Sequence, residues 1–449
     1  MRFDGFHHLL SYWADQTPDA PALVYGTAKT VCSYRALFDT VLRRTDELQR
    51  SEKTCIGIFC DGSFDCVVTI LAASIAGLQV VLFDENTPDA QIPGLMAYTD
   101  VDCLWCDEDL KEELTPHLTP GAGDGWGKLL FFTSGTTDRA KAVVLTEKSL
   151  CASAWNGSAM LPLRQDDRLL CMLPLNHVFG FVCGLLWGLS CGACVALGRG
   201  ARHYYDDLQH FCPTAVSVVP LLLGFLLKNN CMNDALRLVL VGAGDCPPQL
   251  LALAAGRGLQ VSFGYGLTET SSGVAISVSG DPYAMEVCPD DHITIADDGE
   301  ILVAAPTCIM QGYYKMEEAF AAVVKAGVLH TGDLGHFDAD GKLHITGRKK
   351  EMLVLQDGTK LFLPEYEREL AGVLGTQELA VILKNGQPVL VLQGDDSRRS
   401  AVVEQLKPLM ALRPRGQQLR EILFVQDPLP RTATGKIQRW ELQQKVEKE

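Results

Sequence analysis

The 449-residue sequence is 47% hydrophobic and 21% charged, which is typical of a folded globular chain and excludes disorder as a general description. Its 39 Lys and Arg residues against 55 Asp and Glu residues leave a net charge of −16, and no long run of basic residues offsets it. Because such a chain repels phosphate backbones, we expect no nucleic-acid partner.

Short apolar runs alternate with helical segments from about residue 54 to residue 265. A strand is expected at 55–59, then a helix at 64–76 that Gly77 ends, and then a strand at 78–83. Further strands are expected at 128–132, 214–219, 236–241 and 259–263, with a helix after Pro220. Continuous apolar strands with helical crossovers predict parallel sheets covered on both faces, so the fold class is α/β.

Residues 169–198 carry no formal charge and are long enough to span a bilayer. Pro174, Asn176, His177 and five glycines interrupt the segment, however. It therefore favours a helix near 178–189 followed by a strand near 193–197, as in a buried β-α-β unit, over a membrane span.

The sequence changes in character after residue 345. Pro364 stands where a helix would begin, and residues 379–392 predict a hairpin that turns at Asn385 and Gly386. We expect a large N-terminal domain over 1–347 and a small α+β domain over 348–449.

Sixteen cysteines are scattered among apolar residues without regular spacing, which favours small core residues in a reducing compartment. The pairs Cys103/Cys106 and Cys191/Cys194 lack a His or a second pair at zinc-site spacing, so a metal or redox role is the less favoured interpretation. The N-terminus lacks the features of a secretory signal, and a cytoplasmic location is expected.

A polar loop that could surround phosphate oxygens follows the strand at 128–132. Small hydroxyl residues and a glycine let backbone N–H groups approach phosphates closely, and a nearby lysine adds a positive charge. The residues are Thr133, Ser134, Gly135, Thr136, Thr137 and Lys141. The Walker A pattern is absent, and an ordinary polar turn is the alternative.

Two further polar turns carry carboxylates. In the first, Tyr265 and Gly266 precede Thr268 and Glu269, whose carboxylate is a hard oxygen ligand suited to Mg²⁺. In the second, Asp333 could accept both hydrogen bonds of a ribose diol, although taken alone it is better explained as a turn residue.

With these turns, the segments at 347–351 and 430–436 complete an ordered set of motifs, TSGTT, YGLTE, TGD, GRKKE and PRTATGK. In this order the motifs resemble those of the adenylate-forming superfamily of acyl-CoA synthetases, adenylation domains and luciferases, over nearly the whole chain. The pattern is most similar to that of bacterial fatty acyl-CoA ligases.

The resemblance implies a nucleotide site for ATP and Mg²⁺ and assigns a role to each motif. Thr133–Thr137 and Lys141 would cover the β- and γ-phosphates, and Thr268 and Glu269 would contact the α-phosphate and the metal. Tyr265 would lie against the adenine, Asp333 and Arg348 would hold the ribose, and Lys350 would be the hinge of the small domain. Lys436 would bridge the substrate carboxylate and the α-phosphate, as a cation suits the meeting of two anions.

The chain departs from the family pattern at Asp138, Ala140, Ala142 and Glu147. These departures put the closure of the phosphate loop in doubt more than the fold, because Asp138 adds a negative charge beside the phosphates.

The resemblance also implies a pocket for the acid, formed by small and apolar residues with one titratable group at the centre. The pocket residues are His177, Val178, Gly242, Ala243, Gly244 and Ser271. A buried charge without a partner is costly, so we expect an apolar, fatty or similar, carboxylic acid. For His177 the alternative is a core histidine.

Three functions stay open at the level of sequence. The acid could pass to the thiol of CoA or to the phosphopantetheine of an acyl or peptidyl carrier protein, or the chain could be a non-catalytic nucleotide-binding relative.

Overall fold

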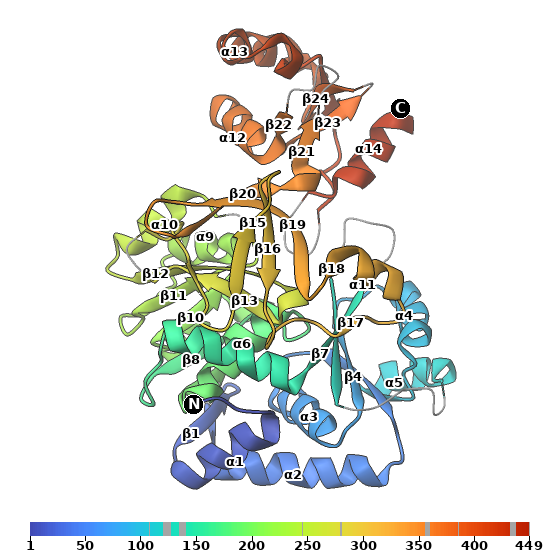
Figure 1. Ribbon diagram of the computed structural model, residues 1–449, viewed down its shortest axis with the longest axis vertical. Coiled ribbons are helices and arrows are strands. Elements are labelled where there is room, and N and C mark those ends of the chain that lie inside the picture. The colour runs from blue at the N-terminus through green and yellow to red at the C-terminus, as the bar shows by residue number, and fades with distance from the viewer. Residues whose placement is uncertain are drawn as a thin grey trace.

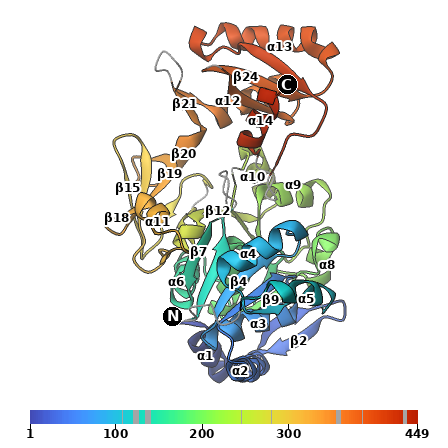
Figure 2. The same cartoon turned by 90° about the vertical axis from the view of Figure 1, so that its right-hand side faces the viewer.

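The computed structural model describes residues 1–106, 108–119, 127–133, 141–244, 246–278, 281–354, 360–384, 386–431 and 437–448. Figures 1 and 2 show two large sheets and their helices at one end of the molecule, and the last elements of the chain at the other end. A smaller sheet around β16 (Glu300–Ala304) and β19 (Val328–Phe337) lies between the two ends. Strands alternate with helices through the first part of the chain, which confirms the predicted α/β class.

One sheet has six strands, in the spatial order β17 (Gly312–Tyr313), β7 (Ala142–Thr146), β6 (Lys128–Phe132), β4 (Gln79–Asp84), β3 (Cys55–Cys60) and β5 (Cys103–Trp105). Its central strands are parallel and mostly apolar, as the runs of Val, Ile and Leu predict. β7 and β17 extend one edge in antiparallel fashion. The loop of residues 133–141 therefore joins two neighbouring strands, β6 and β7.

The second sheet has nine strands, in the order β14 (Glu286–Val287), β13 (Ser272–Ile276), β12 (Gln260–Leu267), β11 (Leu238–Val241), β10 (Ala215–Val218), β8 (Arg168–Cys171), β9 (Cys194–Leu197), β1 (Pro21–Tyr25) and β2 (Thr30–Ser33). From β12 to β1 the strands are parallel. The predicted strands at 214–219, 236–241 and 259–263 are β10, β11 and the first half of β12.

Three helices near the N-terminus pack into the apolar core that the two sheets share. They are α1 (Phe6–Gln16), α2 (Tyr34–Arg50) and α3 (Phe64–Ile75). α3 is buried on nearly all sides, and one apolar core joins its Leu71 to Leu82 of β4 and Val195 of β9. A helix that is apolar all round is stable only when neighbours cover every face, which explains its central position.

Other helices cover the outer faces or lie near strand ends. They are α4 (Ile92–Thr99), α5 (Glu108–Leu114), α6 (Glu147–Met160), α8 (Asp207–Phe211), α9 (Pro220–Lys228), α10 (Pro248–Ala255) and α11 (Glu317–Val323). α9 begins at Pro220, as predicted. The N–H groups of a first helical turn have no carbonyl partner within the helix, so the missing N–H of proline costs nothing there.

The uncharged segment at 169–198 forms the predicted helix and strand. Its helix consists of a π-helical part, η3 (Gly180–Leu186), and a short α7 (Trp187–Ser190), followed by β9. A side-chain carbon at Gly180 would stand 2.2 Å from the carbonyl oxygen of Pro174, so only glycine permits this turn. No helix in the described part of the chain is both long and apolar enough to cross a bilayer.

A third, antiparallel sheet follows, with β15 (His292–Ile295), β16 (Glu300–Ala304), β18 (Val324–Lys325), β19 (Val328–Phe337) and β20 (Leu343–Arg348). β20 leads into the last part of the chain, where the described elements are β21 (Met352–Val354), β22 (Lys360–Phe362), α12 (Leu363–Leu374), β23 (Leu379–Lys384), β24 (Gln387–Gln393), α13 (Arg399–Ala411), β25 (Glu421–Val425) and α14 (Arg439–Lys448).

The last part of the chain has cores of its own. Two apolar clusters consist only of residues from 361 onward, and the predicted hairpin is present as β23 and β24. We propose on this basis that residues 348–449 form a separate domain, as the sequence predicts.

The cysteines have the burial expected of core residues. Eleven of the sixteen are buried, and all sixteen are free thiols. Burial raises the pKa of Cys171 to about 12, so this thiol stays protonated and unreactive at neutral pH.

A half-buried carboxyl between α6 and β15 makes stability depend on pH. Asp291 accepts a hydrogen bond from Asn156 through Oδ2 at 3.1 Å, while its buried Oδ1 has no partner within the described residues. Burial, aided by the charge of Asp290, raises the pKa of Asp291 to about 7. The folded protein therefore holds this proton at pH values where the unfolded chain has lost it.

We expect the free energy of unfolding to fall as pH rises from about 4 to 7, because the folded state binds more protons than the unfolded state in that window. Asp291→Asn removes this titration, so thermal unfolding should show a melting temperature above that of the parent at pH 8 but not at pH 5. An equal shift at both pH values would contradict the assignment. Asp297→Asn, at an exposed carboxyl, is the matched control.

Candidate active site

The second and third polar turns meet at a buried carboxylate. Asp333 of β19 is only 3% exposed. Its Oδ2 accepts a hydrogen bond of 2.8 Å from the hydroxyl of Tyr265, and its Oδ1 lies 2.8 Å from Nε of Arg348. Burial, with the charge of Asp333, keeps the pKa of Tyr265 well above its usual value, so the hydroxyl is a proton donor.

Strand register places these groups. Asp333 and Arg348 are directly opposite each other in the β19–β20 ladder, and Tyr265 lies in β12 of the large sheet. Cross-strand neighbours on one face are close enough for a salt bridge. The structure thus brings together three residues that the sequence predicted for the adenine and ribose. Their contact with a nucleotide is a proposal.

Glu269 lies just beyond the end of β12, in the short helix η5 (Thr268–Thr270). Its backbone carbonyl accepts from the N–H of Met310 at 2.8 Å, and its Oε1 accepts from the hydroxyl of Tyr313 at 2.7 Å. Gly266 precedes this turn, and a side-chain carbon there would meet the carbonyl oxygen of Ser272 at 1.8 Å. Only glycine permits so close an approach of β12 and β13.

The ends of the predicted phosphate loop are held together. The N–H of Thr133 donates to the carbonyl of Lys141 at 2.9 Å, so the loop begins and ends at one point of the β6–β7 pair. The ammonium of Lys141 lies 4.6 Å from the centre of the Tyr313 ring. Ser134, Gly135, Thr136 and Thr137 lie outside the described residues, as does Asp138.

The predicted acid pocket lies where η3 approaches the ends of β11 and β12. The ring of Phe179 covers Gly242, where a side-chain carbon would come within 2.9 Å of it. Ala243 has a φ of 60°, a strained left-handed conformation for a residue with a side chain. Ser271 donates to the carbonyl of Cys308 at 2.6 Å. The turns at 242–244 and 271 are thus fixed by backbone constraints.

His177 is half-buried in this region. Burial lowers the pKa of His177, and the charge of Asp84 opposes that shift only in part. The imidazole is therefore neutral at pH 7. Val178 next to it is buried. A neutral ring among apolar groups agrees with the expectation of an uncharged acid tail.

A small cavity of about 20 Å³, room for one water, lies among α6, η3, β11 and β13, and none of the predicted pocket residues lines it. Its lining is apolar apart from Ser153 and Cys183, and includes Leu161, Trp187, Leu240 and Ile276. Cys183 lies 3.4 Å from the hydroxyl of Ser272 through its Sγ, which ties the cavity wall to β13. Within the described residues, the buried hydroxyl of Ser153 has no hydrogen-bond partner.

The two predicted lysines of the small domain cannot be placed as side chains. Lys350 lies in the turn η6 (Lys349–Glu351). At this residue the structure describes only the backbone. Lys436 lies outside the described residues. The neighbouring Lys349 is held by Asp298 at 2.6 Å and Glu300 at 2.8 Å, and these carboxylates raise the pKa of Lys349.

Sequence reasoning missed Tyr313, which contacts both Glu269 and Lys141. The only signal was a Gly-Tyr-Tyr run at 312–314, too short to indicate a strand. A two-residue strand is recognisable only when its partner, here β7, is already in place.

Comparisons with known proteins identify the family of this chain. The model of the family described as "AMP-binding enzyme" matches residues 128–314. Over 73% of its length the chain is 31% identical to the indoleacetate–CoA ligase of Aromatoleum aromaticum, covering 69% of that protein. The chain belongs to the AMP-binding enzyme family. It is also 27% identical to the 2-succinylbenzoate–CoA ligase of Bacillus cytotoxicus, over 96% of this chain and 97% of that one.

Solved structures of this family have the same fold. The o-succinylbenzoate CoA synthetase of Bacillus subtilis, in complex with its acyl-adenylate intermediate, matches with a TM-score of 0.83 at 23% identity, covering 97% of each chain. An anthranilate CoA ligase in complex with anthranoyl-AMP matches with a TM-score of 0.84 at 20% identity, over 99% of this chain and 98% of that chain. The predicted adenylate-forming architecture is confirmed.

Asp333→Asn tests whether the carboxylate at the centre of this site serves the nucleotide. Loss of a charged acceptor should weaken ATP binding about tenfold. Because Arg348 is half-exposed and can be solvated, the melting temperature should change little. Isothermal titration calorimetry and thermal unfolding measure the two effects. Asp338→Asn, which removes a charge just past the end of the same strand, is the control and should leave ATP affinity unchanged.

Proposed function

We propose that this protein uses ATP to activate a carboxylic acid as an acyl-adenylate and then transfers the acyl group to the thiol of CoA. The observation that carries the proposal is the convergence of Tyr265, Asp333 and Arg348, three motif residues far apart in the chain, in the fold of the AMP-binding family. Relatives named as acid–CoA ligases support CoA as the acceptor.

The site has suitable groups for Mg·ATP. Asp333 offers a buried carboxylate for the ribose diol, and the carboxylate of Glu269 is a hard oxygen ligand for Mg²⁺. When bound, the metal ion would supply positive charge that neutralises the phosphates. Thr133 and Lys141 mark the two ends of a loop that we propose covers the β- and γ-phosphates.

In the first step, a carboxylate oxygen of the acid attacks the α-phosphorus of ATP while the bond to the β-phosphate oxygen breaks and pyrophosphate leaves. In the second, the sulfur of CoA attacks the acyl carbonyl, the thiol proton passes to solvent, and AMP leaves. The protein contributes mainly position and charge complementarity. We propose that Lys436 offsets the repulsion of the two anions in the first step, and that the small domain turns about Lys350 before the second.

We propose that the acid is aromatic. The relatives named above are ligases of indoleacetate, 2-succinylbenzoate and anthranilate. These names favour an aryl acid, and they do not support the fatty acid expected from the sequence.

Pyrophosphate exchange over a panel of acids tests this proposal. We expect exchange with one or more of benzoate, anthranilate, indoleacetate and 2-succinylbenzoate, and at least tenfold slower exchange with palmitate. Faster exchange with palmitate would refute the aryl-acid assignment.

The same assay decides between the remaining functions. Bound ATP without exchange for any acid would identify a non-catalytic relative. If exchange occurs, mass spectrometry of products formed with CoA or with a phosphopantetheine-loaded carrier protein identifies the acceptor, and we expect the CoA thioester.

Lys436→Ala should separate the two steps. The adenylation rate should fall by about 10²–10³-fold, the usual cost of losing one charge-stabilising group, while thioester formation from supplied acyl-adenylate is retained. Single-turnover assays of each step measure this. Lys445→Ala, at an exposed lysine of α14, is the control. Equal losses in both steps would contradict the domain-rotation account.

A further inference from the structure

Tyr313 connects two groups that the proposed function places around the phosphates. Its hydroxyl donates to Oε1 of Glu269 at 2.7 Å, and its ring lies 4.6 Å below the ammonium of Lys141. The residue is 7% exposed and belongs to β17, which pairs with β7 directly after the phosphate loop. One buried side chain thus touches both the anion and the cation.

The hydroxyl acts as a donor. The bond runs from the phenol to the carboxylate, whose oxygens accept hydrogen bonds. The hydrogen bond occupies Oε1 and fixes the rotation of the carboxylate. Among the described residues none donates to the other oxygen, Oε2, which is thus the oxygen left for a metal ion.

The ring acts on Lys141 in a different way. The face of an aromatic ring carries partial negative charge and attracts a cation placed over it. Lys141 is the last residue before β7, so this attraction holds its flexible side chain beside Glu269. The two contacts of Tyr313 are chemically separate, and different substitutions can remove them one at a time.

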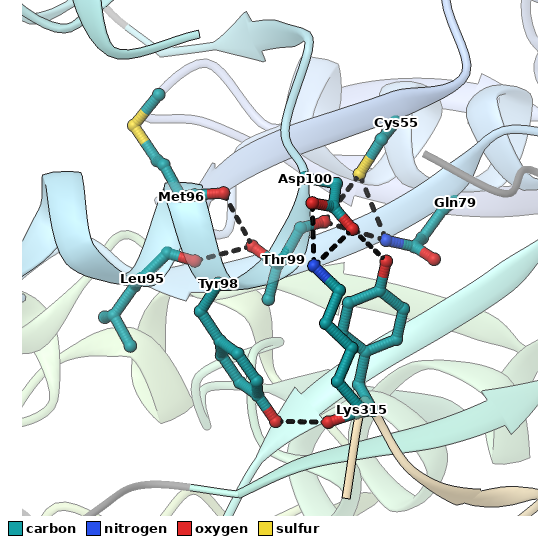
Figure 3. A network of polar contacts seen from close by, with 9 residues as sticks. Cys55, Gln79, Leu95, Met96, Tyr98, Thr99, Asp100 and Lys315 are labelled. Atoms are coloured by element: carbon teal, nitrogen blue, oxygen red, sulfur yellow. Dashed lines mark hydrogen bonds and ion pairs between the residues drawn. The ribbon is translucent and has the colours of Figure 1, made fainter. Parts of the chain in front are cut away.

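The two residues after Tyr313 are held by side chains at the end of α4, which lies far earlier in the chain (Figure 3). Asp100, at the end of α4, accepts from the hydroxyl of Tyr314 at 2.6 Å and from the ammonium of Lys315 at 2.8 Å. The hydroxyl of Tyr98 donates to the carbonyl of Tyr314 at 2.5 Å. Figure 3 shows the side chain of Lys315 turned toward Asp100, and the hydroxyl of Tyr98 pointing toward the backbone beside Lys315. This network fixes the two residues that follow Tyr313 and therefore the direction of its ring.

We propose that Tyr313 is a positioning residue, which orients Glu269 toward Mg²⁺ through its hydroxyl and Lys141 toward the phosphates through its ring. This inference rests on the proposed function and deepens it, because it assigns the orientation of two groups that the motifs only name.

Tyr313→Phe tests the hydroxyl alone. Isothermal titration calorimetry with α,β-methylene-ATP, with Mg²⁺ and with EDTA, separates metal-dependent from metal-free binding. We expect the affinity in Mg²⁺ to fall about fivefold to tenfold, as for loss of a hydrogen bond to a charged group, and the affinity in EDTA to stay unchanged. Tyr34→Phe is the matched control, since its buried hydroxyl donates to the carbonyl of Ala193 at 2.8 Å, in the core.

Tyr313→Leu tests the ring. It should show the loss in Mg²⁺ and, in addition, a several-fold loss in EDTA, because Lys141 is no longer held. If both variants lower only the melting temperature and leave the Mg²⁺-dependent affinity at the parent value, Tyr313 has a structural role and the inference is overturned. Failure of the proposed function has a different signature, namely a parent enzyme that binds the analogue but supports no pyrophosphate exchange.

Discussion

The pairing of the Asp333 carboxylate with Tyr265 and Arg348 is the interaction on which the geometry of the site depends. A carboxylate that is 3% exposed would be costly without partners, and here each oxygen has one. The interaction joins the end of β12 in the nine-stranded sheet to the β19–β20 ladder of the third sheet. It also fixes the end of β20, from which the chain enters its last part.

A second set of contacts connects the site to the edge of the six-stranded sheet. There the six-stranded sheet contributes its edge strands β7 and β17, and Tyr313 on β17 contacts Glu269, which follows β12 of the other sheet. Both sheets therefore reach the site through strand ends or edges, where backbone and side chains are free to meet a ligand. This arrangement is typical of α/β folds, in which sites form beyond the carboxyl ends of strands.

Much of the fold was predictable because its central strands are buried on both faces. Runs such as 55–59 and 236–241 leave little choice other than a parallel strand, and the helices from 64 and 220 begin at a Ser cap and at a proline. The small edge strands were not predictable. β14, β17 and β18 have two residues each, and only a neighbouring strand makes them recognisable.

By itself the sequence determined the fold class, the order of the motifs and the residues that carry charge, since these depend on local pattern and residue chemistry. Only the tertiary structure decided which side chains meet. It paired Asp333 with both Tyr265 and Arg348 and placed Tyr313 between Lys141 and Glu269. Such contacts join residues tens to hundreds of positions apart, and their distances follow from sheet register and packing, which no local pattern records.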